Sequence, residues 1–107
     1  MYSIRVKSLF SQELCYTFIN MNKEEFEALK VRALEIGDVH ATLELADYYL
    51  EINKPNLAYQ VVYRSAIKQY PSAERRLGYF YEKGIGVAID YHKAFHLYSS
   101  AAQRGDL

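Results

Sequence analysis

The sequence has little cysteine and no excess of either charge, and both shortages exclude classes of protein. Its single cysteine, Cys15, cannot form an intramolecular disulfide, and no second cysteine stands at metal-ligand spacing, so a disulfide-stapled scaffold is excluded. Lys plus Arg number 13 and Asp plus Glu also number 13. Long-range electrostatic attraction to nucleic acid or to an anionic membrane is therefore not expected.

Long apolar runs are also missing. No stretch approaches the roughly 20 apolar residues that span a bilayer, and the first residues lack the apolar region and cleavage site of a signal peptide. We therefore expect a cytoplasmic protein without a membrane partner. Tyrosine, by contrast, is abundant: there are 11, against five Phe and no Trp. Because tyrosine buries a ring while its hydroxyl reaches water, we expect most of them between the helices of a thin stack.

Two patterns of small and apolar residues occur twice along the chain. Ala41-x-x-x-Leu45-Ala46-x-x-Tyr49 returns 32 residues later as Ala73-x-x-x-Leu77-Gly78-x-x-Tyr81. Ala58-x-x-Val61-Val62-x-x-x-Ala66 returns 36 residues later as Ala94-x-x-Leu97-Tyr98-x-x-x-Ala102. The four extra residues fall in Gly84-Ile85-Gly86-Val87. A period in the thirties with two helical stripes is typical of helix-turn-helix solenoids.

Helix-start and helix-end signals divide the chain in the same way. The sequence predicts helices near residues 23–36, 39–52, 55–69, 72–83 and 90–104. Start signals are the capping box Asn22-x-x-Glu25, the caps Asp38, Ser72 and Asp90, and Pro55 in a first turn; Gly37 and Gly105 fit left-handed helix ends. We expect Gly78 and Ala102 to be places where helices approach closely.

The second unit resembles the Sel-one-like repeat, a relative of the tetratricopeptide repeat. The resemblance rests on Ala73 to Val87 with its Leu77-Gly78, Tyr81 and Gly84-x-Gly86-Val87, on Asp90-x-x-Lys93-Ala94, and on Ala101-Ala102-x-x-Gly105-Asp106, in the family's order and spacing. It implies a mostly all-α superhelix of about two repeats over residues 23–107, which binds a partner protein or peptide through its concave groove.

The resemblance weakens toward the N-terminus. The preceding unit, about residues 38–71, has Ile52-Asn53-Lys54-Pro55 where the motif has its glycine loop, so we expect a shorter turn there. Residues 23–36 match the second helix of a degenerate leading unit. The N-terminal segment, residues 1–22, lies outside the resemblance. Alternating apolar residues in 1–20 favour a β-hairpin, and a helix from Ser8 to Met21 is the alternative.

Chemistry-bearing residues are sparse. His92 and His96 would share a helix face as metal-binding pairs do, but the sequence places no third ligand beside them, so we expect no metal site. Gly84-Ile85-Gly86 has no preceding strand and no following Gly-Lys-Ser/Thr, so it indicates a turn and not a phosphate loop. Ser99 and Ser100 lie in a predicted helix without a local acid-base constellation. We expect no enzymatic activity and no cofactor, and a metal-dependent hydrolase is the least favoured function.

In helical repeats of this class, the first helix of each unit lines the concave groove. A partner would therefore contact the positions of that helix that lie off its packing stripe. These positions have spacings of four, three and one, so each set forms one helical face. They are Leu43, Asp47, Leu50 and Glu51 in one unit and Arg75, Tyr79, Glu82 and Lys83 in the next. An adaptor that holds a peptide or domain fits this prediction. A stoichiometric inhibitor, such as a bacterial immunity protein that neutralises a toxin or enzyme, fits it equally well.

The last helix suggests a second surface. Gly105-Asp106-Leu107 copies the start of a unit and no further unit follows in the sequence, so we expect apolar groups of this helix to be partly uncovered. The set is Phe95, Leu97, Tyr98 and Ala101. Covering it would favour association with a partner or a homodimer.

Overall fold

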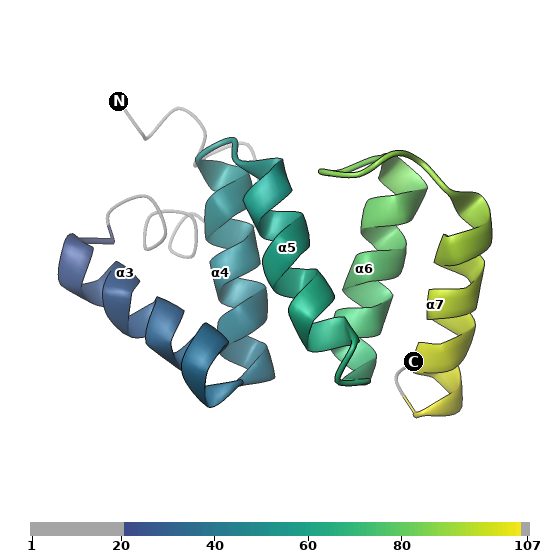
Figure 1. Ribbon diagram of the computed structural model, residues 1–107, viewed down its shortest axis with the longest axis horizontal. Coiled ribbons are helices and arrows are strands. Elements are labelled where there is room, and N and C mark those ends of the chain that lie inside the picture. Colours follow the sequence, from purple (N-terminus) through teal and green to yellow (C-terminus); the bar gives the residue numbers. More distant parts are fainter. Residues whose placement is uncertain (1–20, 106–107) are drawn as a thin grey trace.

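The computed structural model describes residues 21–105, which form a row of helices (Figure 1). Helix α3 (Lys23–Lys30) continues directly into the π-helical segment η1 (Val31–Ile36) and is followed by α4 (Val39–Glu51), α5 (Pro55–Ala66), α6 (Pro71–Lys83) and α7 (Tyr91–Gln103). These bounds confirm the predicted helices, and no strand occurs within the described residues. The hairpin predicted for residues 1–20 lies outside them. No helix in this part of the chain is both long and apolar enough to cross a membrane.

Most of the predicted helix ends are built as the sequence indicates. Asn22 and Glu25 form a reciprocal capping box, in which Glu25 N donates to Asn22 Oδ1 over 2.8 Å. Asp38 accepts from His40 N and Asp90 accepts from Lys93 N. The prediction for Ser72 is wrong. Helix α6 begins one residue earlier, at Pro71, because proline's fixed φ suits a first helical position that needs no donor; its cap is the backbone of Tyr70.

Consecutive helices pack in order along the chain, as Figure 1 shows, and α4 also contacts α6. Small side chains lie at these contacts, because a methyl group lets two helix axes approach closely. Ala41, Ala46, Ala58 and Ala73 are all fully buried. The largest fully buried side chains are Phe80, Leu45 and Val62. The core is therefore one continuous layer between helices, as repeat stacking requires.

Gly78 is a site of close approach, as predicted, whereas Ala102 is not. A Cβ on Gly78 would lie 3.0 Å from the Tyr98 ring and 3.3 Å from the Ala94 carbonyl oxygen. Ala102 is exposed, and the buried alanine at this end of α7 is Ala101. Only the first half of this prediction is confirmed.

The turn between α6 and α7 lies within the second unit and packs against the first. It spans residues 84–90, against residues 52–54 for the turn between α4 and α5, which confirms the expected difference in length. Gly86 has φ +70°, and a Cβ there would lie 2.3 Å from the Pro55 carbonyl oxygen at the start of α5. Only glycine combines this backbone conformation with so close an approach.

A buried carboxylate connects the start of α6 with the end of α7. The Glu74 side chain accepts from Ser100 Oγ over 3.0 Å and from Arg104 Nε over 3.2 Å. Glu74 is buried, whereas the Arg104 side chain is partly exposed. Both carboxylate oxygens therefore have donors, which offsets the loss of hydration.

Candidate functional site

The eight predicted groove residues lie on α4 and α6, which contact each other. We call them the first-helix face: Leu43, Asp47, Leu50 and Glu51 on α4, and Arg75, Tyr79, Glu82 and Lys83 on α6. Their side chains differ in how much surface a partner could contact. Leu43 and Leu50 are half-buried and pack against the core, so their apolar surface is largely used within the chain.

Two carboxylates of this face are held by other residues of the chain. Asp47 Oδ1 accepts from Arg76 Nη1 over 2.8 Å, an ion pair that joins α4 to α6. Glu82 Oε1 accepts from the Tyr98 hydroxyl over 2.7 Å, which joins α6 to α7. Burial, assisted by this hydrogen bond, raises the pKa of Tyr98 to about 12. Sequence spacing missed Arg76 and Tyr98, because both come from neighbouring helical stripes.

The exposed part of the face is on α6. Tyr79 is 45% exposed, and Arg75 and Lys83, four residues before and after it, are exposed as well. The Lys83 ammonium lies 6.0 Å from the centre of the Tyr79 ring. A cation at this distance is attracted electrostatically to the face of an aromatic ring. Together with Arg75, one turn earlier on α6, these side chains form one aromatic and basic ridge.

The predicted association surface on α7 is only partly uncovered. Phe95 is 66% exposed, Leu97 and Tyr98 are half-buried, and Ala101 is 1% exposed. The inclusion of Ala101 is therefore wrong, because its methyl group packs inside the helix stack. The sequence prediction also missed Tyr91, which is 68% exposed and shares a helical face with Phe95.

An apolar groove that the sequence did not predict lies between α5 and α7. It has a volume of about 360 Å³, with Leu77 and Tyr81 of α6 among its lining residues. Its other lining residues are Tyr63, Ala66, Ile67, Lys93, His96 and Leu97. No single helical stripe identifies it, because three helices contribute.

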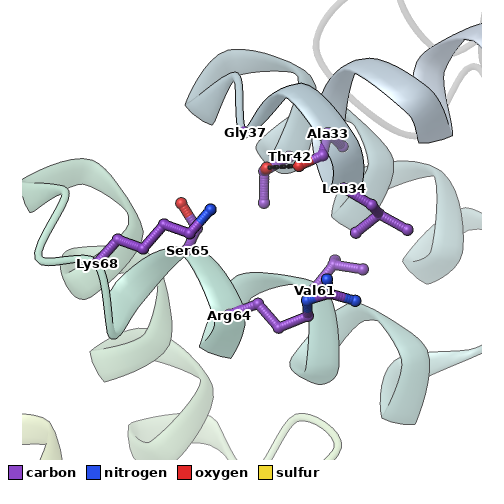
Figure 2. Close-up of a pocket in the computed structure, with 8 residues that line it drawn as sticks. All are labelled: Ala33, Leu34, Gly37, Thr42, Val61, Arg64, Ser65 and Lys68. Carbon is purple, nitrogen blue, oxygen red and sulfur yellow. Dashed lines mark hydrogen bonds between the residues drawn. The ribbon is translucent and has the colours of Figure 1, made fainter.

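A much smaller cleft lies between η1 and α5 (Figure 2). Its free volume is about 10 Å³, which is room for one water molecule. Thr42 Oγ1 donates to the Ala33 carbonyl oxygen over 3.3 Å beside it, the bond drawn in Figure 2. Lys68, in the turn after α5, extends its ammonium group toward Gly37. The cleft is too small for a ligand of several atoms and is best described as a packing gap.

The two histidines of α7 share one exposed face, as their spacing predicts. His92 Nε2 and His96 Nε2 lie 3.3 Å apart, and the ring centres are 4.6 Å apart at an angle of 89°. Among the described residues, no group of three or more His, Cys, Asp or Glu side chains is placed to hold a metal ion.

Residues 71–106 match the Sel1 repeat family. This segment is therefore similar to a Sel1 repeat. It covers α6, α7 and the loop that packs on Pro55, as the motif predicted. Sel1 repeat proteins generally mediate interactions between proteins.

The fold is shared with a solved structure as well. The crystal structure of a Sel1 repeat protein from Oxalobacter formigenes aligns with a TM-score of 0.57 over 92% of this chain and 94% of that one. Sequence identity is 20%, so the likeness concerns the fold. A comparison with curated protein sequences finds no match.

Proposed function

We propose that the chain is a protein-protein interaction module that binds a partner protein or peptide through the first-helix face. The observation that carries this proposal is the ridge formed by Tyr79 between Arg75 and Lys83. Tyrosine and arginine are over-represented among the residues that dominate binding energy at protein interfaces. The Sel1 repeat over residues 71–106 supports an interaction role, and the ridge lies within that repeat.

The ridge also indicates which partner chemistry fits this face. Asp47 and Glu82 are already held by Arg76 and Tyr98, whereas the Lys83 ammonium is exposed beside the Tyr79 ring. Such a surface favours an acidic segment that carries an apolar or aromatic side chain for Tyr79. Opposite charge at the rim would mainly speed association, and contact with the Tyr79 ring would mainly slow dissociation.

The test combines partner capture with matched tyrosine variants. Affinity purification of the tagged chain, followed by mass spectrometry, identifies the partner, and calorimetry then measures its Kd. Tyr79→Ala is expected to weaken binding by at least about 1–2 kcal/mol, the usual effect of truncating an interface anchor. Tyr91→Ala removes an even more exposed tyrosine that lies outside the first-helix face, so it should bind like the parent.

One outcome would contradict the proposed binding face, and another would distinguish an inhibitor from an adaptor. If Tyr79→Ala and Lys83→Ala both keep parental affinity while Ile67→Ala loses it, the α5/α7 groove binds the partner and the first-helix face does not. If the captured partner is a toxin or enzyme whose activity disappears at a one-to-one ratio, the interaction is that of a stoichiometric inhibitor. An adaptor would leave the partner's activity intact.

A further inference from the structure

The two histidines of α7 have a geometry that their sequence spacing alone does not provide. Their Nε2 atoms are 3.3 Å apart while the ring centres are 4.6 Å apart, so the rings converge at their Nε2 edges. Both side chains are exposed. Converging nitrogens on an accessible surface can share one proton or coordinate one metal ion.

The distance fits a metal ion closely. Two imidazole nitrogens bound tetrahedrally to Zn²⁺ at about 2.0–2.1 Å lie about 3.3–3.4 Å from each other. The observed separation of the two Nε2 atoms therefore matches the separation expected in such a chelate. Helix α7 fixes both Cα positions, so the second nitrogen binds intramolecularly once the first is bound.

We infer that His92 and His96 form a bidentate site for a borderline divalent transition metal such as Zn²⁺. Imidazole suits Zn²⁺, Cu²⁺ and Ni²⁺, whereas Mg²⁺ and Ca²⁺ prefer oxygen ligands. Two Nε2 atoms occupy two positions of the ion, and water fills the others. The bound ion exchanges readily with solution, because two protein ligands are fewer than the four that hold a structural zinc ion.

This inference departs from the sequence analysis, which expected no metal site at His92 and His96. The missing third ligand argues against a tightly held ion, and it does not argue against a chelate on the surface. His96 also lines the apolar α5/α7 groove, so the site stands at the edge of that groove. The inference does not depend on the first-helix face and can fail separately from the proposed function.

The experiment titrates the chain with ZnCl₂ by calorimetry and follows the melting temperature at the same metal concentrations. We expect one Zn²⁺ per chain and a rise in melting temperature, since an ion that binds the folded helix stabilises it. His92→Ala and His96→Ala should each weaken binding by roughly a hundredfold, because each removes the chelate. His40→Ala is the matched control: His40 is exposed on α4, belongs to no such pair, and should leave the affinity unchanged.

Nuclear magnetic resonance provides a second readout that does not depend on stability. Substoichiometric Cu²⁺ should broaden the ring protons of His92 and His96 before those of His40. Circular dichroism confirms that each variant folds. Equal broadening of all three histidines, or equal Zn²⁺ affinity in the parent and the His92→Ala variant, would overturn the inference and leave a shared proton as the reason for the short distance.

Discussion

At the scale of single residues, the sequence predicted where small side chains recur in the repeat more reliably than it predicted which of them are buried. Gly78 contacts Tyr98 and Ala94, but Ala102 is exposed although its repeat partner Ala66 is buried. The difference is physical. Ala66 belongs to α5, against which α6 packs, whereas no further helix packs on α7 within the described residues. Repeat alignment finds equivalent positions, but it does not show which neighbours cover them.

Replacing Gly78 with Leu should therefore destabilise the protein, and Ala102→Leu should not. The larger side chain at 78 would displace the Tyr98 ring and its hydrogen bond to Glu82. Overpacking of this kind typically costs about 1–3 kcal/mol. Urea unfolding of both variants measures the free energy of unfolding. Equal stability of the two variants would contradict the close approach at Gly78.

At the scale of helices and turns, periodicity predicted the five helices and the shorter turn of the first unit, because both depend on local spacing. It could not predict the Glu74 network, whose members are 26 and 30 residues apart and lie on different helices. Nor could it predict the α5/α7 groove, which needs the relative placement of three helices. Contacts of this kind depend on packing angles, and the one-dimensional pattern does not contain them.

Removing Arg104 tests the buried carboxylate. Arg104→Met leaves Glu74 with Ser100 as its remaining donor, so we expect a loss of about 1–3 kcal/mol in the free energy of unfolding. Arg64→Met is the control, because no ion pair of Arg64 occurs among the described residues. Chemical denaturation of both variants provides the comparison. If Arg64→Met costs as much as Arg104→Met, the effect comes from the lost side-chain packing and not from the unpaired carboxylate.

At the scale of the whole molecule, tyrosine hydroxyls connect the helices across both kinds of interface. Tyr59 of α5 and Tyr81 of α6 are hydrogen-bonded over 2.8 Å between the units, while Tyr98 reaches Glu82 within the second unit. Burial, followed by the hydrogen bond to Tyr81, raises the pKa of Tyr59 to about 12. The abundance of tyrosine predicted this role in a general way, but the partners had to come from the structure.

These raised pKa values predict an alkaline loss of stability. An unfolded tyrosine loses its proton near pH 10, whereas Tyr59 and Tyr98 in the folded chain keep theirs to about pH 12. Between these limits the unfolded state binds fewer protons, so the free energy of unfolding falls as pH rises, and below pH 10 the two groups add no pH dependence. Urea unfolding from pH 8 to 11 should show a shallower decline in the double variant Tyr59→Phe, Tyr98→Phe. Tyr91→Phe should keep the parental slope.

The contact between Gly86 and Pro55 has a consequence for how the chain opens. In a repeat array, stability divides into a contribution from each unit and a coupling between neighbours. Here the coupling includes the backbone of a loop that rests on the first turn of the preceding helix, in addition to side chains on helix faces. Separating α6 and α7 from the rest would uncover the start of α5. Fraying of the second unit is therefore linked to fraying of the first, and amide protons at the start of α5 should exchange with solvent at the rate set by the whole array.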